Sequence, residues 1–269
     1  MRSLEPEFSC DSEVHVWRVD LTHGSGDGSP DLMVPDERQR ASEFRCVDAH
    51  RTYVKTRTAL RMILSGYLGI TAREIQFDYS AYGKPELSRN MQTLSFNVSH
   101  SGDRALIAVS RTAVGIDLEC IRRKQNWREL ADVVCGTAES STWLNSPAEQ
   151  ARHAFYAHWT AKEAYLKARG VGMSLPLHAV RIRWTGGVPS LDVDAVFSDA
   201  RPWFLQQLDV PLPYVAMLAT PCAGTRVKFF SFFPLHEDTA PVGKQNRPPV
   251  SGYLSSHLDM HDADFFTRH

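Results

Sequence analysis

Two long segments with helical periodicity, each followed by short segments of alternating polarity, most constrain the fold of this chain. In the first, apolar residues recur at roughly helical spacing over residues 35–68, and Gly69 stands where the helix would stop. In the second, a helix is expected to run to about Arg169, before Gly170. This order predicts an α+β fold of two similar halves related by pseudo-two-fold symmetry, each a small antiparallel sheet packed with a long helix.

The boundaries of domains and elements follow from the same patterns. We expect an N-terminal half over residues 1–121, a C-terminal half over residues 122–235, and a poorly ordered tail over residues 236–269. Residues 99–103 are expected to form a loop, and Ser146 and Glu149 a capping box with Pro147 as the first helical residue. The expected strands are residues 14–20, 75–79, 94–98, 105–110, 114–119, 178–184, 191–197, 214–220 and 227–233.

Composition excludes several classes of protein. The 30 Lys and Arg residues nearly balance the 31 Asp and Glu residues, which argues against nucleic acid or an anionic membrane as a partner. No apolar run approaches the ~20 residues that a membrane span needs, and the N-terminus carries charges where a signal peptide would be apolar. The five cysteines form no CxxC pair and indicate reduced thiols. We therefore expect a soluble, cytoplasmic protein.

The segment VGIDLE, residues 114–119, places two carboxylates on one face of an expected strand. Because side chains alternate along a strand, Asp117 and Glu119 would project together from one face, their Cα atoms about 7 Å apart, while the apolar residues face the core. Two such carboxylates repel unless a cation lies between them, and oxygen ligands favour a hard ion such as Mg²⁺. Taken alone, however, the segment is explained slightly better by a solvent-facing acidic pair.

The segment WTAKEAYLK places a second set of charges on one face of the second long helix. Glu163 and Lys167 are four residues apart and share that face with Trp159. They would lie at the edge of an apolar stripe. There they would either take part in a reaction or form an ordinary Glu–Lys ion pair. Such a pair stabilises a helix by only about 0.2–0.5 kcal/mol. The helix alone does not distinguish these two interpretations.

A third group of polar residues lies at two expected turns. Glycine permits close approach of the backbone to a ligand, lysine supplies a point charge suited to phosphate, and serine and histidine add hydrogen-bond donors. Taken singly, GKP is a turn and His100 is a loop histidine. The residues concerned are Gly83, Lys84, Pro85, Asn97, Ser99 and His100.

The segments are far more specific together than one by one. In order, the chain contains FRCVDAHRT, YGKP, FNVSHSGD, VGIDLE and FYAHWTAKEAYLKARGVGM. This series resembles the 4′-phosphopantetheinyl transferases, and among them the Sfp-type branch that modifies carrier domains of polyketide and non-ribosomal peptide synthetases. The resemblance spans residues 14–233, and the monomeric architecture of two halves in that branch matches the length of 269 residues.

The resemblance implies a Mg²⁺-dependent enzyme, with Mn²⁺ as an alternative ion. It would move the phosphopantetheine arm of coenzyme A onto a serine of an apo acyl or peptidyl carrier protein and release adenosine 3′,5′-bisphosphate. By the same resemblance, Asp117, Glu119 and Glu163 are the metal ligands. Glu163 is also the general base, a role that competes with tight binding of the ion, and Lys167 stabilises charge on the pyrophosphate. Contacts with coenzyme A are implied for Arg40, Gly83, Lys84, Pro85, Asn97, Ser99, His100, Asp117, Glu163 and Lys167.

Two other functions stay open at this point. A degenerate relative would bind coenzyme A without chemistry, although the intact set of three carboxylates argues against it. A Mg²⁺-dependent phosphodiester hydrolase would release adenosine 3′,5′-bisphosphate from coenzyme A without a carrier, although no second metal constellation supports it. The sequence does not identify the carrier protein, its fatty-acid, polyketide or peptide pathway, or the tolerance of acyl-coenzyme A.

Overall fold

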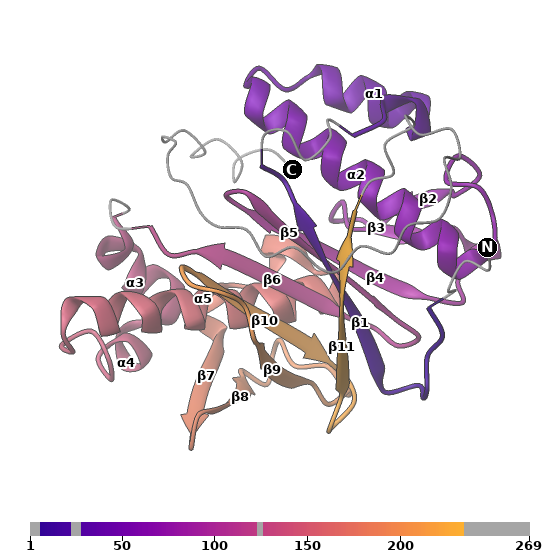
Figure 1. Cartoon of the computed structure of the whole chain (residues 1–269). Coiled ribbons are helices and arrows are strands. Elements are labelled where there is room, and N and C mark those ends of the chain that lie inside the picture. The colour runs from indigo at the N-terminus through magenta and orange to yellow at the C-terminus, as the bar shows by residue number, and fades with distance from the viewer. Residues whose placement is uncertain (1–5, 23–27, 123–125, 234–269) are drawn as a thin grey trace, which may run out of the picture. The chain divides into compact units, whose positions relative to one another are not determined.

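Two β-sheets carry most of the strands in this computed structural model, which describes residues 6–22, 28–122 and 126–233 (Figure 1). One sheet has the strand order β11-β1-β5-β4 and the other the order β6-β10-β9, while β2–β3 and β7–β8 are separate two-stranded pairs. The strands are β1 (Glu13–Asp20), β2 (Phe77–Tyr79), β3 (Pro85–Leu87), β4 (Ser95–Ser101), β5 (Arg104–Ser110), β6 (Gly115–Cys120), β7 (Val180–Thr185), β8 (Val188–Val193), β9 (Phe204–Leu208), β10 (Tyr214–Thr220) and β11 (Arg226–Phe232).

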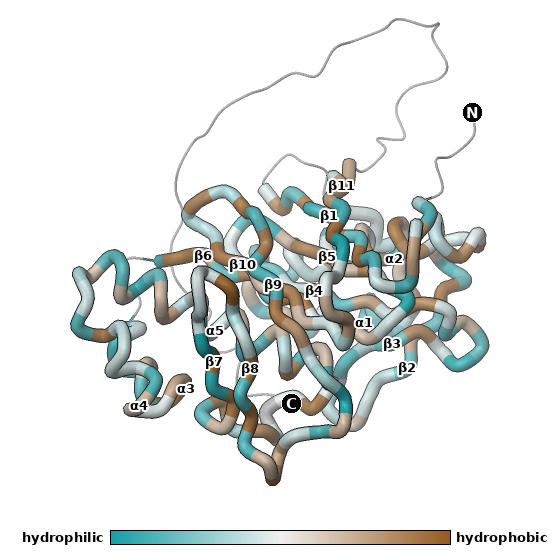
Figure 2. Tube along the Cα trace, turned by 90° about the horizontal axis from the view of Figure 1, so that it is seen from below, coloured by the Kyte–Doolittle hydropathy of each residue, from teal (hydrophilic) through white to brown (hydrophobic). Residues whose placement is uncertain are grey.

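Helices cover both sheets. They are α1 (Pro35–Ser42), α2 (Val47–Leu68), α3 (Trp127–Cys135), α4 (Thr137–Ser140) and α5 (Ala148–Arg169). One apolar core lies between α2 and the four-stranded sheet, with Leu64 and Ile107 in it. A second lies between the two sheets, where Val16 and Ile116 are buried, and a third lies under α5 around Met217. Both views accordingly place α5 beside β6 and β10 (Figure 1 and Figure 2).

Glycine ends both long helices, as predicted. Gly69 and Gly170 have φ angles of +64° and +68°, a left-handed conformation that glycine adopts without the steric cost of a Cβ. The predicted capping box at the start of α5 is wrong. Pro147 has a ψ of 141°, which is not helical, and precedes the first helical residue instead of occupying it. Glu149 pairs with Arg152 one turn further along the helix.

A buried ion pair fixes α1 against α2. Both oxygens of the Glu37 carboxylate accept hydrogen bonds from the guanidinium of Arg61, at 2.7 Å from Nε and 2.9 Å from Nη2. The same guanidinium donates to the carbonyl oxygens of Ala72 and Ile75. A guanidinium with this many partners is tolerated in the core, where a lone charge would be costly.

Several elements differ from those that the sequence pattern predicts. β4 continues through Ser101, where a loop is predicted, because Gly102 makes the turn to β5 with a φ of +58°. α3 is not predicted, although Trp127, Ala131 and Val134 are buried at helical spacing. β9 has no counterpart among the predicted strands. β1 pairs with β11 in parallel, while the pattern predicts antiparallel neighbours throughout.

Strand pairing crosses the predicted boundary between the two halves. β10 pairs with β6, β11 pairs with β1, and the described residues fall within one compact unit. The division at residue 121 stays a prediction, and the predicted tail, residues 236–269, lies outside the described residues. None of the described helices combines the length and the apolarity that crossing a bilayer requires.

Candidate active site

β6 carries the two carboxylates of the VGIDLE segment on the face turned toward α5. The apolar side chains that alternate with Asp117 and Glu119 are buried in the core between the two sheets, as the pattern predicts. α5 approaches this face very closely because residue 115 is a glycine. A Cβ at Gly115 would lie 2.1 Å from the backbone carbonyl oxygen of Ala164.

An ion pair joins α5 to β6 at this face. Nζ of Lys167 lies 2.6 Å from Oδ1 of Asp117, and only 4% of the Asp117 side chain is exposed, against 31% for Lys167. Lys167 therefore lies between a buried carboxylate and solvent. Glu163, one helical turn earlier, interacts electrostatically with both of these groups, so the predicted set of charges on α5 does meet the set on β6.

The second carboxylate oxygen of Asp117 is buried without a partner. Oδ1 accepts a hydrogen bond from Oγ of Ser99 at 2.9 Å in addition to the contact with Lys167. Oδ2 has no hydrogen-bond partner among the described residues. A buried polar atom without a hydrogen bond lowers the stability of the folded state by about 1–3 kcal/mol. A cation bound at this oxygen would remove that cost.

Burial and mutual repulsion make the neighbouring carboxylates weak acids. Burial first, and then the charge of Asp117, raises the pKa of Glu119 to about 7. The same two causes raise the pKa of Glu163 to about 7. For Lys167, burial acts to lower the pKa, but the charges of Asp117 and Glu163 outweigh it and raise the pKa. The site thus carries more negative charge than one lysine neutralises.

The donor set fits a hard divalent cation by its chemistry. Across residues 6–22, 28–122 and 126–233, no three His, Cys, Asp or Glu side chains gather closely enough to form a metal site. The ammonium of Lys167 interacts instead with Asp117, Glu119 and Glu163. These three side chains offer oxygen ligands, an excess of negative charge and the partnerless Oδ2, which together suit Mg²⁺.

Side chains of β4 occupy the edge of β6 that faces away from β10. An open strand edge leaves backbone groups unpaired, and proteins cover such edges in various ways. Here polar side chains at alternate positions of β4 cover the edge of β6, which explains the polar pattern of the FNVSHS segment. The backbone N–H of Ile116 donates to Asn97 (2.8 Å), that of Leu118 to Ser99 (3.1 Å) and that of Cys120 to Ser101 (3.0 Å).

The GKP turn brings Lys84 to the C-terminal end of α5. Nζ of Lys84 lies 3.4 Å from the carbonyl oxygen of Ala168 and 3.5 Å from that of Val114. Burial lowers the pKa of Lys84. Gly83 has a φ of +77°, and Pro85 begins β3. Lys84 thus contacts the backbone beside the start of β6 and at the end of α5.

The structure does not bring His100 and Arg40 into the carboxylate cluster. His100 follows Ser99 on β4 and is exposed on the opposite face of that strand. Arg40 lies in the last turn of α1, close enough to Tyr53 of α2 to influence its hydroxyl electrostatically. The roles of these residues in binding coenzyme A stay predictions, as do those of Asn97 and Ser99.

Ser101 contacts the site, although its sequence pattern does not predict this. Its hydroxyl donates a hydrogen bond to Oε2 of Glu119 at 3.0 Å. The spacing of Asn97, Ser99 and Ser101 is visible in the sequence. It acquires meaning only when β4 extends through residue 101, because the three side chains then share one face.

The first lysine of the WTAKEAYLK segment is structural. Lys162 is completely buried, and its ammonium donates to Oε2 of Glu139 at 2.7 Å. It also donates to the carbonyl oxygens of Val134 and Leu177, at 2.9 Å and 3.2 Å. Lys162 therefore ties α5 to the segments on either side of it in the chain, and it contacts none of the three site carboxylates.

We expect Lys162→Met to lower the free energy of unfolding by about 3 kcal/mol, because it leaves the buried Glu139 carboxylate without its cation. Urea denaturation followed by circular dichroism measures the change. Arg183→Met is the control, because it removes only an exposed ion pair with Asp192 and should cost less than about 1 kcal/mol. Equal stability of the two variants would contradict a structural role for Lys162.

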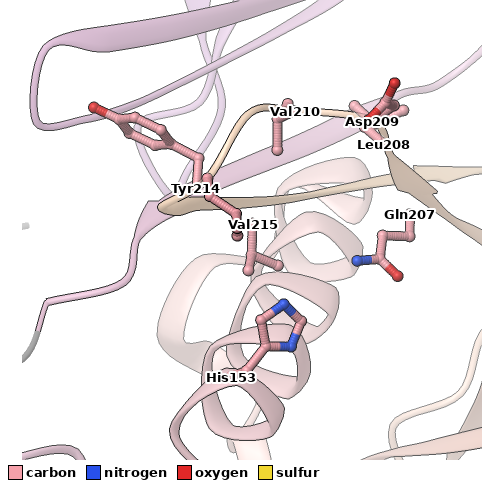
Figure 3. A pocket seen from close by; sticks show the side chains of 8 residues that line it. His153, Gln207, Leu208, Asp209, Val210, Tyr214 and Val215 are labelled. Atoms are coloured by element: carbon pink, nitrogen blue, oxygen red, sulfur yellow. The ribbon is translucent and has the colours of Figure 1, made fainter. Parts of the chain in front are cut away.

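A pocket of about 390 Å³ lies between α5 and the connection from β9 to β10 (Figure 3). Figure 3 shows His153 of α5 on one wall and Val215 of β10 beside it. None of the predicted site residues lines this pocket, so it is separate from the candidate active site. Its lining residues are His153, Gln207, Leu208, Asp209, Val210, Leu212, Tyr214 and Val215.

Comparison with known proteins gives two matching family models and several similar proteins. The model described as 4′-phosphopantetheinyl transferase superfamily matches residues 113–215, and the one described as 4′-phosphopantetheinyl transferase, N-terminal, matches residues 29–112. The 4′-phosphopantetheinyl transferase HetI of Nostoc sp. is 35% identical over 226 residues, which cover 82% of this chain and 92% of that protein. The 4′-phosphopantetheinyl transferase Sfp of Bacillus subtilis is 31% identical over 153 residues, 56% of this chain and 66% of that protein. A phosphopantetheinyl transferase of Thraustochytrium sp. is 30% identical over 190 residues, 65% of this chain and 66% of that protein.

Proposed function

We propose that this chain performs its reaction between β6 and α5. The chain belongs to the 4′-phosphopantetheinyl transferase superfamily and transfers the phosphopantetheine arm of coenzyme A to carrier proteins. One observation carries the proposal. The ion pair of Asp117 with Lys167 lies beside a buried Asp117 oxygen without a partner, within a group of three carboxylates. Such a group suits a reaction at a pyrophosphate because carboxylates can hold a divalent cation. That cation and Lys167 would balance the negative charge at the point of bond cleavage.

Each residue has a defined task in this reaction. The hydroxyl oxygen of the carrier serine forms a bond to the phosphorus that bears the pantetheine arm, and the bond from that phosphorus to the bridging pyrophosphate oxygen breaks. Glu163 accepts the serine proton, and adenosine 3′,5′-bisphosphate leaves with the bonding electrons. Lys167 donates to the pyrophosphate oxygens as their charge increases.

For the metal, we propose Asp117 and Glu119 as the principal ligands of Mg²⁺, or of Mn²⁺ in its place, with Glu163 as the third. When bound, the ion neutralises charge on the pyrophosphate and orients it for displacement. The partnerless Oδ2 of Asp117 and the raised pKa values of the two glutamates support this assignment. Because a carboxylate that binds the ion tightly is a poor base, we assign Glu163 primarily to proton transfer.

The remaining predicted residues would bind the rest of coenzyme A. Lys84 supplies a cation at the C-terminal end of α5, where its ammonium contacts the carbonyl oxygen of Ala168. His100 and Arg40 would take the phosphate of the adenosine part, and the turn formed by Gly83 and Pro85 would lie against the nucleotide. Asn97 and Ser99 belong to this proposal as residues of the adjoining strand β4.

We further propose that the chain acts as a cytoplasmic monomer on carrier domains of fatty-acid, polyketide or peptide synthases. All the proposed catalytic side chains come from one chain, on two elements that pack directly against each other. No second copy is therefore needed to complete the carboxylate cluster.

Modification of an apo carrier domain tests this function. The chain is incubated with coenzyme A, Mg²⁺ and a panel of apo carrier domains from the three classes of synthase, and intact-protein mass spectrometry follows each carrier. We expect a gain of one phosphopantetheine group that EDTA prevents and added Mg²⁺ restores. The absence of any gain across the panel would contradict the function. Release of adenosine 3′,5′-bisphosphate without a carrier would favour a hydrolase instead.

A further inference from the structure

Two serines of β4 each contact the backbone of β6 and one of its carboxylates. Oγ of Ser99 donates to Oδ1 of Asp117 (2.9 Å) and accepts from the backbone N–H of Leu118 (3.1 Å) and from Nζ of Lys167 (3.1 Å). A hydroxyl group has one proton and two lone pairs, so the hydrogen-bonding capacity of Ser99 is fully used within the protein. Ser99 thus holds Asp117 and Lys167 in a fixed relation to the strand.

Ser101 repeats this arrangement two residues later. Its Oγ accepts a hydrogen bond from the backbone N–H of Cys120 and donates one to Oε2 of Glu119, both at 3.0 Å. The bond from Cys120 fixes the hydroxyl oxygen at the strand edge, which leaves its proton for the carboxylate. Within the part of the chain that the structure describes, no other side chain hydrogen-bonds to Glu119. The orientation of that carboxylate therefore depends on Ser101.

Protection of the strand edge does not by itself explain the two hydroxyl groups. Asn97 occupies the corresponding position at the start of the same row, where its Oδ1 accepts from the backbone N–H of Ile116 at 2.8 Å. It covers the edge as Ser101 does, but it hydrogen-bonds to no carboxylate among the described residues. The two serines differ from Asn97 in that each also hydrogen-bonds to a carboxylate of the proposed metal site.

We propose that Ser101 is a positioning residue for the transfer reaction, which holds the Glu119 carboxylate in the orientation that binds the divalent cation. This inference rests on the proposed function, in which Glu119 is a metal ligand. Groups that orient metal ligands through hydrogen bonds typically change metal affinity or activity about 10–100-fold when they are removed. Ser101 orients Glu119 without touching substrate or metal itself.

The test compares three variants by their dependence on metal. Ser101→Ala is expected to raise the Mg²⁺ concentration for half-maximal transfer about tenfold. It is also expected to weaken the binding of Mn²⁺ to the free chain by a similar factor, as measured by electron paramagnetic resonance. Ser101→Thr keeps the hydroxyl group on a residue suited to a strand and should restore both values. If the alanine variant does not fold, Ser101→Cys, a weaker donor of similar size, should give a smaller shift in the same direction.

Ser110→Ala is the matched control. It removes a buried serine hydroxyl of the neighbouring strand β5, whose hydrogen bonds join it to Thr112 and not to a carboxylate, so the Mg²⁺ midpoint and the Mn²⁺ affinity should equal those of the parent chain. If Ser101→Ala shifts neither quantity, or if Ser110→Ala shifts both as far, the hydroxyl group of Ser101 does not orient Glu119 and the proposal is wrong. Transfer by the parent chain that needs no divalent cation would instead refute the proposed metal role itself.

Discussion

Replacing Glu163 with glutamine is expected to lower the rate of phosphopantetheine transfer about a thousandfold. The amide matches the carboxylate in size and keeps an oxygen that can bind a metal ion, but it cannot accept the proton of the carrier serine. Loss of a positioned general base typically costs about 10²–10⁴-fold. Single-turnover transfer to an apo carrier, followed by intact-protein mass spectrometry at saturating coenzyme A, gives the rate of this step.

The Mg²⁺ dependence of the same variant separates the two roles proposed for Glu163. If Glu163 acts chiefly as the base, Glu163→Gln lowers the maximal rate and leaves the Mg²⁺ midpoint near that of the parent chain. If it acts chiefly as a ligand, the midpoint rises and high Mg²⁺ recovers most of the rate. A variant with full activity and an unchanged midpoint would refute both roles.

Glu163→Gln is not expected to lose activity through a loss of stability. Burial and the charge of Asp117 raise the pKa of Glu163 to about 7, so the folded chain binds the proton more tightly than the unfolded chain does. Above that pH, the ionised carboxylate therefore lowers stability, and a neutral amide removes the penalty. We expect the melting temperature of metal-free Glu163→Gln at pH 8 to be no lower than that of the parent chain.

Local sequence patterns predicted which charged residues share a face within each element, but not that the two faces meet. Alternation along one strand predicts that Asp117 and Glu119 share a face, and a spacing of four residues does the same for Glu163 and Lys167. The structure brings these two faces together through β6 and α5. That meeting is a tertiary contact, which only the resemblance to a known family, and no local pattern, implied.

Contacts between distant elements account for most of what the sequence does not predict. The row of β4 side chains along β6 joins residues nearly twenty positions apart, and its polar spacing looks the same as that of an exposed strand end. Helical spacing places Lys162 off the face that carries Glu163 and Lys167, but it does not show what either lysine contacts. One is completely buried against Glu139, whereas the other reaches Asp117, because they lie on different faces of α5.

No local sequence pattern predicts that Gly115 is needed for the packing of α5 on β6. Replacing it with alanine is expected to lower the free energy of unfolding by about 3 kcal/mol or more. Its φ angle is not in the left-handed region, so the backbone itself would accept alanine. The obstacle is space, since a Cβ would lie 2.1 Å from the carbonyl oxygen of Ala164 and 2.3 Å from the backbone nitrogen of Ala168. Both atoms belong to the backbone of α5, so the helix must move as a unit, and overpacking of this kind is costly.

The same displacement should impair catalysis, because the helix that must move carries Glu163 and Lys167. A shift of about 1 Å between reacting groups can cost about a hundredfold in rate. We therefore expect Gly115→Ala to lower the melting temperature by about 10 °C and to reduce transfer about a hundredfold in the protein that stays folded. Differential scanning calorimetry and the carrier assay at 20 °C below the melting midpoint measure the two effects separately.

Gly66→Ala provides the matched control for this substitution. Gly66 lies within α2, has no left-handed φ angle, and would place a Cβ in open space, with nothing within 4 Å. Because alanine favours a helix over glycine by about 0.8–1 kcal/mol, this variant should be slightly more stable than the parent chain and equally active. If Gly115→Ala were as stable and as active as Gly66→Ala, the close approach of α5 to β6 would not determine how the charged residues of the two elements are positioned.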